Sequence, residues 1–142
     1  MDAGFKCVLG VDFDAAALKT FKANHGDAEA MKLDLFNHDN INVITKFLKE
    51  HAISLDVLIG GPPCQGFSIA GPRDRNDKRN SLYEAMVKLT QRVQPRAVLL
   101  ENVPGMLTCN EGIGAKRIIS DFDEIGYTMS RVERDAPCYR ER

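Results

Sequence analysis

The part of the sequence that most constrains the fold is a short apolar run that ends in a rigid turn. Residues 57–59, Val-Leu-Ile, have the length and composition of a buried parallel strand. The turn at 60–63, Gly-Gly-Pro-Pro, joins two residues that are free in φ to two in which φ is fixed and the amide hydrogen is absent. It therefore places Cys64 just beyond the carboxyl end of the strand, where open α/β sheets bind their ligands.

Strands and helices are expected to alternate along the rest of the chain. Apolar runs predict strands at 6–11, 28–33, 57–59, 97–100 and 127–132. Helical periodicity predicts helices at about 15–24, 41–51, 81–93 and 115–125. The expected caps are Asp14, then Asp39 or Asn40, then Ser81 in a capping box with Glu84. This alternation predicts an α/β protein with a doubly wound parallel sheet, in a single domain of 142 residues.

Each expected helix has one apolar face that should turn inward. The residues of these faces are Ala17, Leu18, Phe21, Ile41, Ile44, Phe47, Leu48, Leu82, Met86, Leu89, Val93, Ala115, Ile118, Ile119, Phe122 and Ile125.

Composition excludes several classes of protein. A net charge of −1 gives no overall sign of nucleic-acid or membrane binding, so any such signal has to be local. No apolar run approaches a membrane span and no secretory leader is visible, which favours a cytoplasmic protein without a membrane partner. The 4 cysteines are widely spaced and there is no His cluster, so neither a metal site nor a disulfide framework is expected.

Three of the expected strands end in an acidic residue. These are Asp12, Asp34 and Glu101, and a fourth strand leads to Cys64. At the carboxyl edge of a parallel sheet such acids commonly hold ribose hydroxyls or an exocyclic amine. The alternative is that each is a helix cap or a solvated loop acid. The three acids together, taken with the Pro-Pro-Cys turn, favour a ligand site.

Two blocks of sequence resemble the DNA (cytosine-5)-methyltransferase family closely. They are Gly-Gly-Pro-Pro-Cys-Gln-Gly-Phe-Ser at 60–68 and Glu-Asn-Val-Pro-Gly at 101–105, with Arg-Asn-Ser-Leu-Tyr at 79–83 between them. The resemblance implies a Rossmann-like sheet that depends on S-adenosylmethionine. It also implies methyl transfer to C5 of a cytosine flipped out of double-stranded DNA, as in bacterial or phage restriction-modification systems.

The same resemblance implies roles for individual residues. Cys64 would be the nucleophile, Glu101 the acid that engages the cytosine, and Arg140 and Arg142 the cations that stabilise the adduct. These arginines lie in a block that is similar to Pro-Gln-x-Arg-x-Arg, with Cys138 where the family has Gln. The cofactor-binding residues would be Asp12, Phe13, Asp34, Leu35 and Pro62. The residues that meet DNA would be Pro63, Gln65, Ser68 and Asn102.

Several features of the family have no counterpart in these 142 residues. There is no Gly-x-Gly strand at the start, no sequence-reading region and no last block, so residues 1–142 are expected to form a partial catalytic domain. Without the first strand, the strands at 6–11 and 57–59 would lack a shared neighbour and would expose unpaired edges. Either the chain is a piece of a longer protein or a complementing chain fills the place.

Other interpretations of the sequence stay open. The chain is either a segment of an active methyltransferase, a catalytically inactive remnant, or one part of a split enzyme. A methyltransferase that acts on an exocyclic nitrogen or on RNA is less favoured, since enzymes acting on an amino nitrogen have Tyr after Pro-Pro and need no cysteine. A redox or phosphatase role for Cys64 is less favoured, because the flanking motif of such a cysteine is absent around it. The loop at 73–79, with four cations and two acids, either meets DNA phosphates or is a solvated loop.

Overall fold

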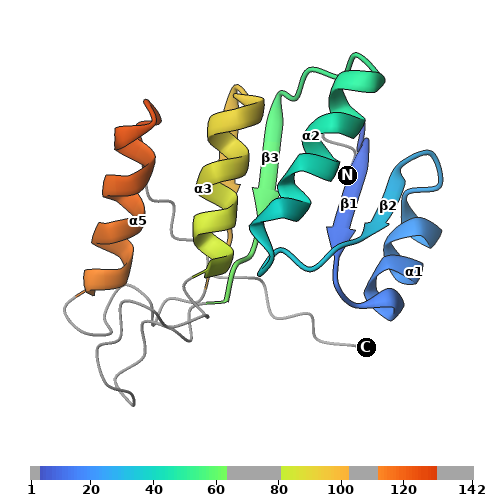
Figure 1. Cartoon of the computed structure of the whole chain (residues 1–142), viewed down its shortest axis with the longest axis horizontal. Coiled ribbons are helices and arrows are strands. Elements are labelled where there is room, and N and C mark those ends of the chain that lie inside the picture. The colour runs from blue at the N-terminus through green and yellow to red at the C-terminus, as the bar shows by residue number, and fades with distance from the viewer. Residues whose placement is uncertain (1–3, 64–80, 103–111, 131–142) are drawn as a thin grey trace, which may run out of the picture.

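A computed structural model describes residues 4–63, 81–102 and 112–130 of the chain (Figure 1). Its elements are β1 (Leu9–Asp12), α1 (Ala15–Asn24), β2 (Glu29–Lys32), the short 3₁₀ helix η1 (His38–Asn40), α2 (Ile41–Glu50), β3 (Val57–Gly60), α3 (Ser81–Val93), β4 (Ala97–Leu100) and α5 (Ile113–Glu124). The α/β class expected from the sequence is confirmed. None of the helices in the described ranges is long and apolar enough to cross a membrane.

Local capping chemistry explains where the helices begin and end. The side chain of Asp14 accepts a hydrogen bond from the amide of Ala16 at 2.7 Å, so the predicted cap of α1 is confirmed. At α2 the prediction is only partly right, because Asn40 is the N-cap residue but makes no side-chain capping bond. After α5, Gly126 adopts a left-handed φ of 88°, which is the conformation that glycine supplies at a helix C-terminus.

The strands form two separate parallel pairs. β1 pairs with β2 in a register that sets Leu9 against Glu29, and β3 pairs with β4 in a register that sets Val57 against Ala97. β1 and β3 are not paired with each other in the part of the chain that the structure describes. The strand predicted at 127–132 is wrong for 127–130, which form no strand, and residues 131 and 132 lie outside the described ranges.

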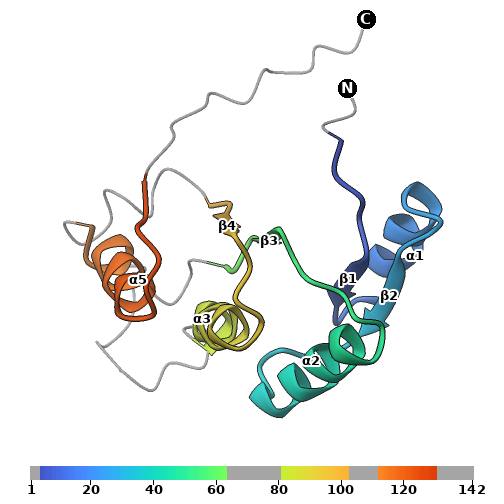
Figure 2. The same ribbon diagram turned by 90° about the horizontal axis from the view of Figure 1, so that it is seen from above.

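Helices lie on both faces of these strands. The ring of Phe21 in α1 packs against Gly10, where an added Cβ would lie 2.5 Å from the ring. On the opposite face, Leu9 and Val11 pack against the core cluster that α2 and α3 share. Figure 2 shows α2 and α3 on that same side, with α1 on the other. The chain therefore places helices on both sides of β1 and β2.

Two apolar clusters hold the helices to the strands. The first joins α2 to α3 and reaches both strand pairs through Val11 and Leu58. The second is centred on Phe122, which is fully buried between α5, α3 and β4. Two of the side chains predicted to face inward do not, since Ala17 is exposed and Ile119 is 45% exposed. Both lie at the margin of a helical stripe, where periodicity alone does not decide which side is covered.

A polar network joins α3 to α5. The hydroxyl of Tyr83, whose side chain is buried, donates to Asp121 at 2.9 Å. Arg117 lies over the Tyr83 ring and forms an ion pair with Glu84 at 3.2 Å. Burial, followed by the hydrogen bond to the Asp121 carboxylate, raises the pKa of Tyr83 well above its ordinary value of 10.0. The Glu84 carboxylate, expected to form a capping box with Ser81, accepts a hydrogen bond from Arg117 of α5 at 3.2 Å.

Candidate active site at the carboxyl edge of the strands

The ends of β3 and β4 bring Glu101 against the glycine turn. The amide of Glu101 donates to the carbonyl of Gly60 at 3.0 Å, which continues the pairing of the two strands by one residue. An added Cβ on Gly61 would lie 3.3 Å from Oε2 of Glu101, so the carboxylate lies over this glycine. A Cβ on Gly60 would lie 2.7 Å from the Met86 side chain of α3. Glycine at 60 and 61 thus lets a helix and a carboxylate approach the backbone closely.

The next residue along each segment makes a second link. The Nδ2 of Asn102 donates to the carbonyl oxygen of Pro62 at 2.9 Å. Pro62 is buried and Asn102 is half-buried, while Pro63 and Glu101 are exposed. Because proline fixes φ and the carbonyl is held by Asn102, the chain leaves this turn in a set direction toward residue 64. Asn102 was expected to contact DNA, and its side-chain amide donates this hydrogen bond to the turn.

The acids at the ends of β1 and β2 each organise a local turn. Oδ1 of Asp12 accepts from the amide of Asp14 at 2.8 Å, and Oδ1 of Asp34 accepts from the amide of Phe36 at 2.9 Å. The second oxygen of each carboxylate has no hydrogen-bond partner among the described residues. Each acid therefore stabilises its local turn with one carboxylate oxygen. The other oxygen is available to accept a hydrogen bond from a donor such as a hydroxyl or an amine.

Exposed aromatic rings lie next to these acids. Phe13, expected to pack on the cofactor, is 67% exposed. Leu35, expected to do the same, instead packs partly against the core cluster of α2. The structure adds Phe36, 43% exposed and two residues beyond Asp34, which the sequence analysis did not single out. The signal that could have found it is the repeated pattern of a strand-terminal acid followed closely by Phe.

Part of the expected site lies outside the described residues. This holds for Cys64, Gln65, Ser68, Arg140 and Arg142, and for the basic loop at 73–79. Within the described ranges, no group of three or more His, Cys, Asp or Glu residues could hold a metal ion. What the structure brings together is Glu101, Asn102 and Pro62, while Asp12 ends β1 and Asp34 follows β2 in the other strand pair.

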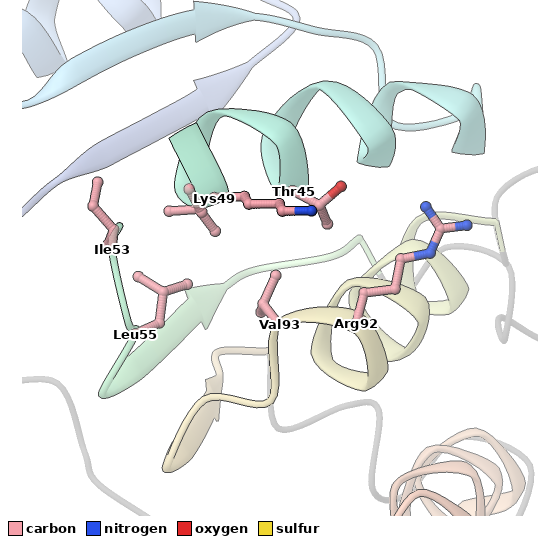
Figure 3. Close-up of a pocket in the computed structure, with 7 residues that line it drawn as sticks. Thr45, Lys49, Ile53, Leu55, Arg92 and Val93 are labelled. Carbon is pink, nitrogen blue, oxygen red and sulfur yellow. The ribbon is translucent and has the colours of Figure 1, made fainter. Parts of the chain in front are cut away.

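A pocket of about 290 Å³ lies elsewhere, between α2, α3 and the segment that leads into β3 (Figure 3). Its lining residues are Thr45, Leu48, Lys49, Ile53, Leu55, Arg92 and Val93. Ile53 and Leu55 precede β3, so this pocket is at the amino end of that strand, away from Glu101. It is not part of the carboxyl-edge site.

Comparison with known proteins gives consistent matches. The family model described as C-5 cytosine-specific DNA methylase matches residues 1–138. The chain is 35% identical over 137 residues to the type II methyltransferase M.AgeI of Thalassovita gelatinovora, covering 96% of this chain and 32% of the relative. It is 41% identical over 87 residues to the DNA (cytosine-5-)-methyltransferase M.ApeKI of Aeropyrum pernix, covering 58% of this chain and 19% of the relative.

A solved structure shows a similar fold. It is a DNA modification methyltransferase encoded within an E. coli prophage, which superposes with a TM-score of 0.65 at 33% identity over 85% of this chain and 31% of that one. The present chain thus spans about a third of the length of M.AgeI and of this structure.

Proposed function

The chain belongs to the C-5 cytosine-specific DNA methylase family, and from this we propose that it transfers a methyl group from S-adenosylmethionine to C5 of cytosine in DNA. The observation that carries the proposal is the gathering of Glu101, Asn102 and Pro62 at the turn immediately before Cys64. The relatives named as type II methyltransferases further support a restriction-modification setting.

Cys64 provides the nucleophile. C5 of cytosine is a weak nucleophile, so the ring has to be activated before it can accept a methyl group. The Sγ thiolate bonds to C6, the C5–C6 electron pair becomes available at C5, and the ring is held as a covalent adduct. After C5 is methylated a base removes the C5 proton, the double bond re-forms and the thiolate leaves. Attack of the thiolate at C6 requires the cytosine to be flipped out of the duplex.

Glu101 assists the attack from the carboxyl end of the adjacent strand β4. A carboxylic acid that protonates or hydrogen-bonds N3 stabilises the charge that builds on the ring as the thiolate adds. Glu101 is exposed at the strand edge and lies over Gly61, so its carboxylate can reach a base placed beside the turn. Arg140 and Arg142 would orient the base, and Pro63, Gln65 and Ser68 would meet the DNA.

The strand ends at β1 and β2 fit the cofactor. S-adenosylmethionine supplies an electrophilic methyl group when it is bound. Asp12 presents one unused carboxylate oxygen for ribose hydroxyls, and Asp34 presents one for the adenine amino group. The exposed ring of Phe13 offers a flat apolar surface for adenine.

A second candidate is an inactive remnant or one part of a split enzyme. It is favoured by one observation, which is that β1 and β3 are not paired with each other within the described residues of a chain that spans about a third of the length of M.AgeI. In this case the Rossmann-like sheet lacks its first strand, residues 1–142 form a partial catalytic domain, and a complementing chain restores activity. A methyltransferase acting on an exocyclic nitrogen remains disfavoured, because it would not need Cys64.

Covalent trapping tests the proposal. The purified chain is mixed with S-adenosylmethionine and duplexes that contain 5-fluorocytosine, whose fluorine blocks the final elimination. A stable protein–DNA adduct that is lost in Cys64→Ser and kept in Cys7→Ser supports catalysis by these residues. An adduct that survives Cys64→Ser contradicts it. If no adduct forms, the same assay with the remainder of a full-length relative added separates a split enzyme from a remnant.

A further inference from the structure

The turn that follows β2 is built around the backbone carbonyl of Asp34. Two groups donate to this one oxygen, the amide of Asn37 at 3.2 Å and Nδ2 of Asn40 at 2.8 Å. The Asn37 amide belongs to the turn itself, whereas the side chain of Asn40 reaches back from the residue that precedes α2. The Asn40 bond therefore ties the peptide group of Asp34 to the helix that comes after the turn.

The side chain of Asn40 serves this turn in place of its own helix. Asn40 is the N-cap residue of α2, a position at which an Asn side chain commonly accepts a hydrogen bond from a helix amide. It makes no such capping bond, and its side-chain nitrogen donates to Asp34 instead. The capping role alone thus does not account for the contact that Asn40 makes.

The short helix η1 and the turn before it are also fastened to the rest of the fold. Nζ of Lys88 in α3 donates to Nδ1 of His38 in η1, with 2.6 Å between the two nitrogens. Leu35, the neighbour of Asp34, packs against the core cluster that α2 and α3 share. Asn40 therefore holds Asp34 from an element whose own position is fixed.

Holding the peptide group of Asp34 limits where its carboxylate can lie. Oδ1 accepts from the amide of Phe36 at 2.9 Å, so the backbone and one side-chain oxygen are both bonded. The other oxygen is the one left available to a ligand. Asp34 comes two residues after Lys32, which is paired with Asp12 across β1 and β2, so the two acids lie at the same edge of this strand pair.

We propose that Asn40 is a positioning residue for recognition of the cofactor. It holds Asp34 so that the available oxygen meets an exocyclic amine, and it thereby helps the site to select an adenosyl group over one with a carbonyl in place of that amine. Asn40 acts through Asp34 and has no assigned contact with the cofactor. The inference rests on the proposed function, because it takes Asp34 to bind the adenine amino group.

Replacement of Asn40 by serine tests the proposal. Serine is also a good N-cap residue, so α2 should still form in Asn40→Ser, but its short side chain cannot reach the carbonyl of Asp34. Asn24→Ser is the matched control, because Nδ2 of Asn24 donates to the carbonyl of Thr20 at 3.1 Å in a bond that is likewise exposed.

The measurement is the affinity for two ligands by calorimetry. S-adenosylhomocysteine carries the amino group, and S-inosylhomocysteine carries a carbonyl oxygen there, which cannot donate to Asp34. The parent chain should prefer the adenosyl ligand by roughly tenfold or more, as for a hydrogen bond to a charged group. Asn40→Ser should lower this preference by about threefold or more, and Asn24→Ser should change it by less than about twofold.

Two results would overturn the proposal. An equal loss of affinity for both ligands in Asn40→Ser would show that Asn40 supports only the fold. A parent chain that binds both ligands equally would contradict the role assigned to Asp34, and the positioning role would fail with it.

Amide exchange separates this proposal from the proposed function. A parent chain that binds neither ligand would count against the function of residues 1–142 alone, and exchange rates would then decide the positioning role. Asn40→Ser should speed exchange of the Phe36 and Asn37 amides, which both bond to Asp34, by about threefold or more. The Leu33 amide, which donates to Asp12 at 3.0 Å, should be unaffected. Unchanged exchange at Phe36 and Asn37 would overturn the proposal.

Discussion

Asn102 and Pro62, 40 positions apart in the sequence, are joined by a hydrogen bond of 2.9 Å from the Asn102 amide to the Pro62 carbonyl. The bond fastens the segment after β4 to the turn after β3. It ties the residue next to Glu101 to the turn that leads to Cys64. The position of Glu101 relative to the turn at Pro62 thus depends on the side chain of the residue that follows it.

Replacing Asn102 should therefore affect adduct formation more than stability. Asn102→Ala removes one partly buried hydrogen bond, which is expected to lower the free energy of unfolding by about 1 kcal/mol. The rate of trapping by 5-fluorocytosine DNA should fall by roughly tenfold or more, since the turn loses its fixed direction. Asn24→Ala, which loses an exposed side-chain bond to the carbonyl of Thr20 at 3.1 Å on α1, is the control. Equal rate losses in both variants would show that only global stability matters.

A side chain at Gly60 should force the Met86 side chain to shift. The added Cβ of Gly60→Ala would lie 2.7 Å from the Met86 methyl group. Overpacking of this kind is expected to destabilise the fold by about 1–3 kcal/mol, measured by denaturant unfolding. Gly26→Ala, where nothing lies within 4 Å of the added Cβ, should change stability by less than about 0.5 kcal/mol. Trimming Met86 to Ala in the Gly60→Ala background should recover part of the loss, and a fully additive double variant would argue against this contact.

Tyr83 should make stability depend on alkaline pH. Its pKa is raised in the folded state by burial and by the neighbouring Asp121 carboxylate, so the folded protein favours the protonated phenol. The stability that this contributes is fully present below the ordinary value of 10.0 and is lost as pH rises above it. The free energy of unfolding should then fall by about 1.4 kcal/mol per pH unit from this group.

Tyr83→Phe isolates that contribution. The variant should be less stable at neutral pH by about 1–2 kcal/mol, because Asp121 loses a donor while it stays partly buried. Urea unfolding from pH 8 to pH 11 should show a smaller alkaline loss in the variant than in the parent chain. Parallel curves for the two proteins would mean that Tyr83 is not the titrating group.

Asp12 should bind the cofactor through charge. Asp12→Asn keeps a side-chain oxygen that can accept from the Asp14 amide, so the turn after β1 should persist. The loss of the carboxylate toward ribose hydroxyls is expected to weaken S-adenosylmethionine binding by roughly tenfold in calorimetry, as for a hydrogen bond to a charged group. Asp14→Asn, which keeps the α1 cap, serves as the charge-matched control. Similar weakening by both would assign the effect to net charge.

Local sequence signals predicted most of the elements. The strand expected at 97–100 coincides with β4, and the caps and apolar spacing placed α1, α2, α3 and α5 to within a few residues. Such signals act over one or two helical turns, so a single sequence carries them in full.

What the sequence could not predict depends on partners that are distant or absent. The apolar residues next to Ile59 in the chain predict that its side chain is buried. Whether it is covered depends on what packs against that face of the sheet. The contact between Asn102 and Pro62 requires two loops to meet, and neither loop encodes it alone. The position of Asp12 and Asp34 after apolar strands is compatible with a ligand-binding and with a structural role. Each forms a turn with one oxygen, which sequence patterns do not resolve because the two oxygens are chemically identical.

The division of the strands into two local pairs has a consequence for how the chain is made. The β1–α1–β2 unit is complete at Lys32, well before the ribosome reaches β3 at Val57. Because each pairing joins strands that are neighbours in the sequence, the first unit can form during synthesis without waiting for the second. The packing of α3 against α2 then joins the two strand pairs through one core cluster.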